Sequence, residues 1–186
     1  MKVVQPIRDK EIIEDIKDYL KERNYRDYVL FMTGINTGLR IGDILKLKVK
    51  DVKGVEDIEL TEMKTGKPKE VPINSSLRKA LKPYIKNMDD DEYLFLSRQK
   101  DAHGVRKHIN RSTAYRIIRE AAIECGFRKR CGTHTMRKTF GFWHYKNNNN
   151  IAALQKIFNH DKEMTTYTYI GVEKDYLDKT IRDLNL

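Results

Sequence analysis

Residues 133–140 read THTMRKTF, and residues 154–171 read LQKIFNHDKEMTTYTYIG. The first segment puts His134 three residues before Arg137, and the second puts His160 nine residues before Tyr169. Residues three apart in a helix project from the same face, so His134 and Arg137 can meet one ligand. An arginine fork grips two phosphate oxygens, and an imidazole donates or moves a proton. The pattern therefore indicates a phosphate-binding set with a tyrosine nucleophile attached to it.

A second arginine joins this set from the first half of the chain. Arg40 lies in TGLRIGD (37–43), between Gly38 and Gly42, where the backbone can pass close to a ligand. Alone, Arg40 is explained as well by a solvated ion pair with Asp43, and an isolated HxxR pair is usually a surface feature. The conjunction of these residues in the order R…HxxR…H…Y favours a functional site.

Hydrophobic periodicity predicts a mixed α+β fold, mostly helical with a small antiparallel β-sheet. The expected helices are 9–23, 26–36, a short one within 39–47, one from 75 or 76 to about 87, 111–125, 133 to about 147, 151–158 and one from about 172. Two strands, 56–63 and 69–73, should flank the TGKP turn as a hairpin. The acidic run 89–92 is expected to be a solvated loop.

Capping residues support several of these helix boundaries. Asp9, Ser75 or Ser76, and Thr133 are suitable N-caps, because their side-chain oxygens can accept from the unpaired N–H groups of the first turn. Gly38 suits the left-handed turn that commonly ends a helix.

The charge balance indicates a polyanionic partner. The 186 residues contain 37 Lys plus Arg against 27 Asp plus Glu, a net charge of +10. Nucleic acid is the first expectation and an anionic membrane surface the second. A membrane role is poorly supported, because no apolar run approaches the roughly 18 residues needed to span a bilayer. No linker-like segment divides the chain, so residues 1–186 are expected to form one domain.

Metal and disulfide chemistry are also poorly supported. Cys125 and Cys131 have no CxxC partner, and His103, His108 and His144 match no metal-ligand spacing. No metal site or cofactor is therefore expected. A reducing cytoplasm is the expected compartment.

Four segments resemble the catalytic domain of the tyrosine recombinase (phage integrase) family. They are TGLRIGDILKLKVKDV (37–52) for the first-arginine box, EMKTGKPKEVPI (62–73) for the hairpin with the family's catalytic lysine, HTMRKTF (134–140) for the HxxR box, and LQKIFNHDKEMTTYTYIG (154–171) for the closing box. Their order and spacing fit the family, and the match covers nearly the whole chain. The resemblance implies the tyrosine recombinase catalytic-domain fold. It also implies a site-specific recombinase or integrase, bacterial or phage-encoded, that breaks and rejoins double-stranded DNA without metal or ATP.

The resemblance also implies a role for each residue of the set. Tyr169 would attack a DNA phosphodiester, giving a 3′-phosphotyrosyl link and a free 5′-hydroxyl, and the covalent bond would store the energy for rejoining. Arg40 and Arg137 would hold the non-bridging oxygens and stabilise the transition state.

The remaining implied roles concern protons and orientation. Lys64 would protonate the leaving 5′-oxygen, and His134 would assist proton transfer at the tyrosine. His160 would hydrogen-bond a phosphate oxygen. Asp43 fits the acidic position that orients and neutralises the first arginine.

Two assignments have rivals within the chain. Tyr167 lies two residues before Tyr169, but the family spacing favours Tyr169 as nucleophile. Lys67 and Lys69 share the hairpin with Lys64, and Lys64 is preferred because it directly precedes the turn.

The expected protein partners depend on two features of the chain, its short N-terminal segment and its C-terminal helix. Family members usually carry a separate N-terminal helical domain that closes around DNA, and this chain has only a few residues before its first helix. It is therefore expected to be a minimal recombinase, a fragment, or a protein that works with an accessory protein. Residues 172–186 are expected to form a helix. As the resemblance implies, this helix would dock on a neighbouring protomer in a homo-oligomer, a tetramer on DNA; otherwise it folds back on its own protomer. The alternative function is a catalytically idle DNA-binding regulator that retains the fold.

Overall fold

The computed structural model describes residues 4–100 and 103–184. The elements there, in chain order, are α1 (Lys10–Arg23), α2 (Tyr25–Thr37), α3 (Ile41–Lys46), the 3₁₀ turn η1 (Val49–Asp51), β1 (Asp57–Thr61), β2 (Pro68–Pro72), α4 (Ser75–Tyr84), β3 (Leu96–Lys100), β4 (Arg106–His108), α5 (Arg111–Glu124), α6 (Thr133–Asn148), α7 (Ile151–Phe158), α8 (Glu163–Ile170) and α9 (Val172–Arg182). The mostly helical class with a small antiparallel component is confirmed.

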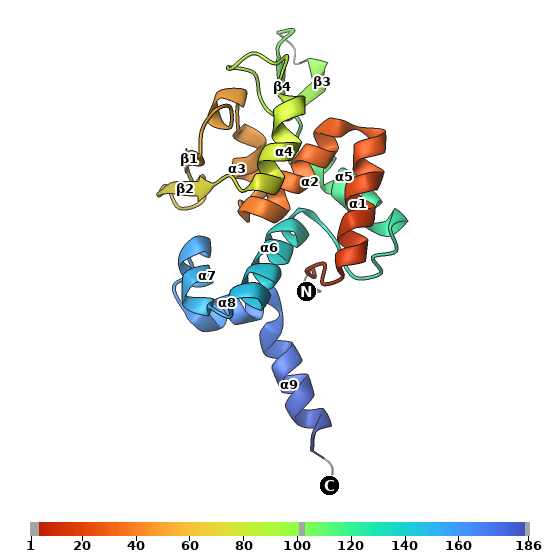
Figure 1. Cartoon of the computed structure of the whole chain (residues 1–186), viewed down its shortest axis with the longest axis vertical. Coiled ribbons are helices and arrows are strands. Elements are labelled where there is room, and N and C mark those ends of the chain that lie inside the picture. Colours follow the sequence, from red (N-terminus) through yellow and green to blue (C-terminus); the bar gives the residue numbers. More distant parts are fainter. Residues whose placement is uncertain (1–3, 101–102, 185–186) are drawn as a thin grey trace.

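Two apolar clusters build the upper part of the molecule (Figure 1). One joins α2, α3, α4 and the β1–β2 hairpin, and the other joins α1, α2, α5 and the start of α6. Helix α2 belongs to both clusters, and it packs so closely on α6 that a Cβ on Gly34 would lie 2.5 Å from the sulfur of Met136. This close contact brings Arg40, just beyond α2, toward Arg137 on α6.

The predicted hairpin is confirmed as an antiparallel pair of β1 and β2. Ile58 pairs with Val71 and Leu60 with Lys69, so these four side chains share the inward face. A second antiparallel pair, β3 with β4, was not predicted. Its sequences, LSRQK and RKH, are short and polar, and they lack the apolar alternation that marks a half-buried strand.

Helix caps are partly as predicted. The Asp9 side chain accepts from Glu11 N, which confirms this N-cap, and Gly38 ends α2 in the left-handed conformation. The prediction for α4 was wrong, because Asn74 caps it in place of Ser75 or Ser76. Thr133 is likewise the first residue of α6, not its cap.

Helices α7 and α8 pack beneath α6 through a third cluster, built on Leu154, Phe158 and Ile170 (Figure 1). Helix α8, EMTTYTYI, was not predicted, since threonine and tyrosine are weak helix formers. The predicted C-terminal helix is present as α9. It extends away from the body (Figure 1), and Tyr176 and Ile181 on it are 68% and 71% exposed. No helix in the described part of the chain is long and apolar enough to cross a membrane.

Candidate active site

Arg40 is held at a sharp break between α2 and α3. Gly38 ends α2 with φ 62°, and a Cβ there would lie 2.4 Å from the Phe140 ring, so this position requires glycine. The chain then passes through the buried Leu39 and sets Arg40 at the start of α3. The Arg40 side chain is 18% exposed, although its Nη1 is buried against Glu62.

The carboxylate beside Arg40 belongs to Glu62, which was not among the predicted site residues. Arg40 Nη1 lies 2.7 Å from Glu62 Oε1 as an ion pair, without the alignment of a hydrogen bond. The Glu62 side chain is fully buried. Its Oε1 also lies 3.3 Å from Lys69 Nζ, while Oε2 accepts from Thr65 Oγ1 at 2.9 Å and Asn159 Nδ2 at 3.0 Å.

Glu62 is ionised at neutral pH despite its burial. Burial alone raises the pKa of Glu62, but the surrounding donors and cations, Asn159 first among them, outweigh it and lower the pKa to about 2. A signal for this residue was present in the sequence: Ile58, Leu60 and Glu62 share the inward face of an alternating segment. An acidic side chain on a buried face needs partners, and that requirement marks it as a candidate.

Asp43 makes its hydrogen bond to the hairpin backbone. Its Oδ1 accepts from Met63 N at 3.0 Å, and its Oδ2 is buried without a hydrogen-bond partner among the described residues. The contacts of the described residues thus pair Arg40 with Glu62, whereas the sequence had suggested Asp43. Asp43 lies in the first turn of α3, and from there it anchors the backbone where β1 leads into the turn.

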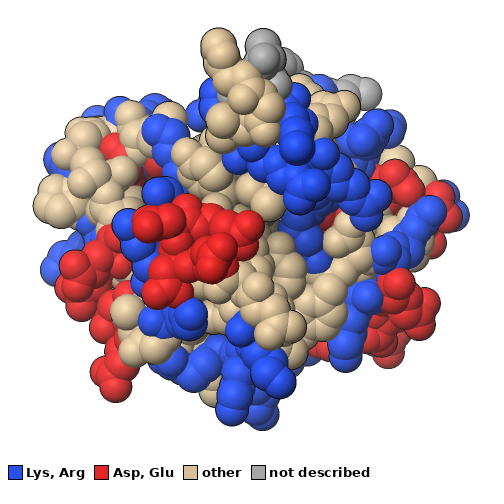
Figure 2. All heavy atoms as spheres, turned by 90° about the horizontal axis from the view of Figure 1, so that it is seen from above, with Lys and Arg blue, Asp and Glu red and all other residues tan. Residues whose placement is uncertain are grey.

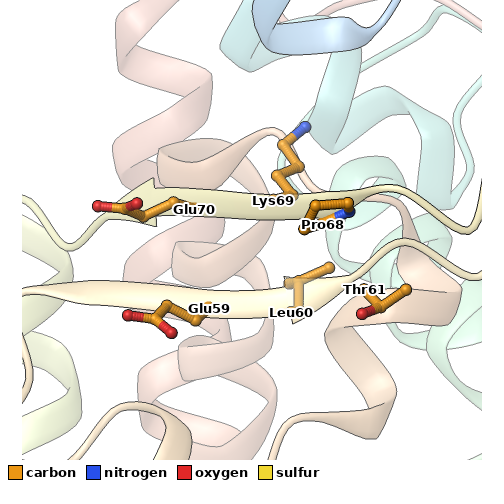
Figure 3. A pocket seen from close by; sticks show the side chains of 6 residues that line it. All are labelled: Glu59, Leu60, Thr61, Pro68, Lys69 and Glu70. Carbon is orange, nitrogen blue, oxygen red and sulfur yellow. The ribbon is translucent and has the colours of Figure 1, made fainter.

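The three lysines of the hairpin occupy different environments. Lys64 and Lys67 are exposed in the turn. Lys69 points toward α7 (Figure 3), and its Nζ donates to Ile157 O at 2.6 Å. Burial first, and then the charge of Arg137, lower the pKa of Lys69. Lys69 is therefore engaged in the structure, whereas Lys64 and Lys67 are both exposed. Of these two, the charge of Lys64 is the one that contributes to lowering the pKa of His134 and of His160.

A groove of about 550 Å³ follows the hairpin (Figure 3). Its lining residues are Glu59, Leu60, Thr61, Pro68, Lys69 and Glu70. None of the predicted site residues lines it. The groove therefore borders the candidate active site at Lys69 without being its centre.

Arg137 is the most deeply buried member of the predicted set, with 3% of its surface exposed. Its Nη1 donates to Gly38 O and its Nη2 to Phe158 O at 3.0 Å, so it links the end of α2 to the end of α7. The guanidinium also lies 4.2 Å from the centre of the Phe158 ring. These contacts fix the plane of the guanidinium before any ligand arrives.

His134 lies one helical turn before Arg137 on α6, at the solvent-facing rim of the site. Its imidazole is nevertheless partly desolvated. This desolvation is the largest cause, and the charge of Arg137 the next, of a lowered pKa for His134. The imidazole is therefore neutral at pH 7 and able to accept a proton.

His160 follows α7 and turns back toward α8. Its Nδ1 lies 3.0 Å from Thr166 Oγ1, and its ring packs edge-on against Tyr169 with 5.4 Å between centres. Burial, and then the charge of Arg137, lower the pKa of His160. The Thr166 contact orients the ring beside the candidate nucleophile.

Tyr169 lies on α8 at the centre of the set. Its hydroxyl is buried beside the Arg137 guanidinium, which is close enough to limit the rise that burial causes in the pKa of Tyr169 but is not aligned for a regular hydrogen bond. The ring contacts Phe158 and His160, and Lys138 Nζ lies 4.8 Å from its centre. Burial raises the pKa of Tyr169, although the charge of Arg137 partly opposes this. The hydroxyl is thus protonated at neutral pH and close to the cation expected to bind phosphate.

Tyr167 faces another way. Residues that are two positions apart in a helix point in directions about 200° apart, so Tyr167 and Tyr169 cannot share a face of α8. The Tyr167 ring packs edge-on against Tyr145, with 5.6 Å between ring centres. The fold therefore brings Tyr169, and not Tyr167, to the arginines.

Basic residues also gather away from this set, at the end of the molecule that carries the β3–β4 hairpin and at the end of α5. Figure 2 shows the end of the molecule with the β3–β4 hairpin, where blue lysine and arginine atoms surround a compact acidic patch. A groove of about 600 Å³ between β3, β4 and α5 is lined by five basic residues, Arg26, Arg98, Lys100, Lys107 and Arg116, among others. Arg128, Lys129 and Arg130 are exposed beside a second groove at the end of α5.

Comparison with known proteins finds relatives along nearly the whole chain. Residues 7–175 match the model of the phage integrase family. A protein described as probable integrase/recombinase YoeC, from Bacillus subtilis strain 168, is 47% identical over 175 residues, which cover 94% of this chain and 93% of that protein. A tyrosine recombinase from Pseudothermotoga lettingae is 30% identical over 183 residues, or 91% of this chain. The match spans only 61% of that longer relative.

A solved structure supports the fold independently. The site-specific recombinase XerH, bound to a palindromic difH substrate in a post-cleavage complex, superposes with a TM-score of 0.75. The superposition covers 97% of this chain and 53% of that one, at 18% sequence identity.

Proposed function

This chain belongs to the phage integrase family of tyrosine recombinases, and from that premise we propose that it cuts and rejoins DNA strands through a 3′-phosphotyrosyl intermediate. One observation carries the proposal. The Tyr169 hydroxyl is buried without an aligned hydrogen bond, at the point where His160, Arg137 and Arg40 converge. A tyrosine in a purely structural role would ordinarily have its buried hydroxyl satisfied.

In the proposed reaction, Tyr169 Oη attacks the scissile phosphorus. The P–Oη bond forms as the bond from phosphorus to the 5′-oxygen breaks. Because burial raises the pKa of Tyr169, the hydroxyl needs a base, and the neutral imidazole of His134 is proposed to assist removal of its proton. His160, beside the tyrosine ring, is proposed to hydrogen-bond a phosphate oxygen.

The arginines supply the charge that the pentavalent transition state requires. Arg137 is fixed by two carbonyl groups, and Arg40 by Glu62, so both guanidinium groups are oriented in advance. Lys64 is proposed to protonate the departing 5′-oxygen from the hairpin turn. Reversal of the same steps by a 5′-hydroxyl would rejoin the strand without ATP.

The test is a nicked DNA duplex from which the short fragment that carries the new 5′-hydroxyl diffuses away after cleavage, so that the covalent intermediate accumulates. The wild-type chain should form a protein–DNA adduct that survives denaturation. The adduct should be linked through the 3′ end of the cleaved strand. DNA binding without any adduct would contradict the proposal and would favour an idle DNA-binding regulator.

We expect binding of the isolated chain to double-stranded DNA to be weak and salt-sensitive. Each phosphate neutralised by Lys or Arg releases counterions, so affinity should fall by roughly 100-fold between about 50 and 200 mM salt. Fluorescence anisotropy with a labelled duplex would measure this. Changing the exposed Lys129 to Gln should reduce the salt slope by about 1 if that residue contacts phosphate. Equal affinities at the two salt concentrations would contradict the expectation.

Helix α9 is proposed to join protomers on DNA. Its exposed apolar residues include Tyr176, Leu177 and Ile181, and α9 leaves the body instead of folding back (Figure 1). A chain ending at Gly171 should keep its unfolding temperature but lose assembly on DNA. Light scattering with and without DNA would measure the assembly.

Ile181→Glu is the matched variant, because it disrupts the apolar stripe without shortening the chain. It should reduce assembly in the same way as the truncation. An unchanged mass for both variants on DNA, with unchanged folding, would remove this role for α9.

A further inference from the structure

Glu62 collects partners from three separate parts of the site. Arg40 comes from the α2–α3 junction, Thr65 and Lys69 from the hairpin, and Asn159 from the end of α7. Each carboxylate oxygen of Glu62 contacts a different kind of partner. Oε1 faces the two cations, whereas Oε2 accepts from the two neutral donors. One buried charge therefore ties together the segments that carry three of the proposed catalytic residues.

We propose that Glu62 is a positioning residue for DNA cleavage, which acts by fixing Arg40 for the scissile phosphate. This inference rests on the function proposed above. Glu62 is fully buried and cannot touch DNA, whereas Arg40 remains partly exposed. Arg40 is thus held on its protein side and open on the other, the arrangement that an arginine needs to receive a phosphate in one orientation.

The negative charge of Glu62, and not only its shape, is required to hold the neighbouring cations together. Arg40, Lys69 and Arg137 lie close enough for the two arginines to lower the pKa of Lys69 after burial has done so. In the described part of the chain, the ion pairs of Arg40 and Lys69 are both made with Glu62. Without this negative charge, the cations would repel one another in a poorly solvated site.

Asn159 contributes the most distant contact to Glu62. It ends α7 in the left-handed conformation, with φ 52°, which asparagine adopts more readily than most residues. From there its Nδ2 donates to Glu62 Oε2 at 3.0 Å. Because His160 is the next residue, this bond couples the backbone before His160 to the carboxylate that holds Arg40.

Glu62→Gln tests the proposal with almost no change in shape. The amide retains one oxygen, but its NH₂ group must face either the cations or the Asn159 donor, so the network cannot be satisfied. We expect single-turnover adduct formation at saturating DNA to slow by about 10- to 100-fold, because Arg40 would no longer be held in one position. The dissociation constant for DNA should change by less than about threefold, since many phosphate contacts share the binding energy.

Glu70→Gln is the matched control, because Glu70 is an exposed carboxylate on the same hairpin. It should cleave at the wild-type rate. Wild-type cleavage by Glu62→Gln, or a loss of affinity that accounts for its slower rate, would overturn the positioning role. A wild-type chain that forms no adduct would instead overturn the proposed function, and this inference with it.

A second variant covers the case in which Glu62→Gln does not fold. Asn159→Asp keeps the shape and the left-handed backbone but puts an acceptor against Glu62 Oε2. It should slow cleavage at saturating DNA, and Asn159→Gly, which only removes the donor, should slow it less. A folded Asn159→Asp chain with the wild-type rate would overturn the proposal.

Discussion

Tyr169→Phe should abolish the covalent adduct with nicked DNA while leaving DNA binding intact. Phenylalanine keeps the ring that packs against Phe158 and His160 and removes only the hydroxyl. That hydroxyl makes no aligned hydrogen bond among the described residues, so its loss should cost little stability. Loss of the attacking oxygen should lower cleavage by roughly 10⁴-fold or more. Denaturing gel electrophoresis of a labelled duplex would measure adduct formation.

Tyr167→Phe is the matched control on the same helix. Tyr167 packs against Tyr145, away from the arginines, so this variant should retain adduct formation. A covalent adduct from Tyr169→Phe that disappears in Tyr167→Phe would reverse the assignment of the nucleophile. If both variants formed the adduct equally well, neither Tyr169 nor Tyr167 could be the sole nucleophile.

Arg137→Lys should reduce cleavage by about 100- to 1000-fold, the usual effect of removing one preorganised transition-state donor. Lysine retains the charge but lacks the planar fork that bonds Gly38 O and Phe158 O together. At least one buried carbonyl should therefore lose its donor, which lowers the free energy of unfolding by about 1–3 kcal/mol. Arg137→Ala should lower both quantities further. Adduct formation and urea unfolding would measure the two effects separately.

Arg40→Lys provides the contrast that separates chemistry from stability. Arg40 bonds no backbone carbonyl in the described structure, and lysine can keep an ion pair with Glu62. This variant should cleave slowly yet unfold at nearly the wild-type urea concentration. If Arg137→Lys destabilised no more than Arg40→Lys, the structural role of the Gly38 and Phe158 contacts would be wrong.

Local patterns predicted several features of the fold correctly. The Asp9 cap, the left-handed Gly38 and the antiparallel hairpin each depend on a few neighbouring residues. Elements without such patterns were missed, namely the polar β3–β4 pair and α8. Tertiary packing forms α8 despite weak propensity, because Ile170 is fully buried against the third cluster.

The candidate site also has features that local patterns predict and features that only the tertiary structure shows. Motif order and spacing are sufficient to select Arg40, His134, Arg137, His160 and Tyr169. Family spacing also favours Tyr169 over Tyr167, and the opposite faces of α8 support that choice. Spacing could not reveal which acid lies beside Arg40, nor that Lys69 is engaged between Glu62 and Ile157.

By itself, then, the sequence determined the family and the helical class and nominated the residues of the candidate site, since these follow from short-range spacing and from motifs in a set order. The tertiary structure alone decided how those residues are held. Glu62 and Asn159 are 97 positions apart and Arg137 and Gly38 are 99 apart, yet each pair is hydrogen-bonded. Burial and pairing depend on which distant segments pack together, and they determine which charges are neutralised and which remain available to a phosphate.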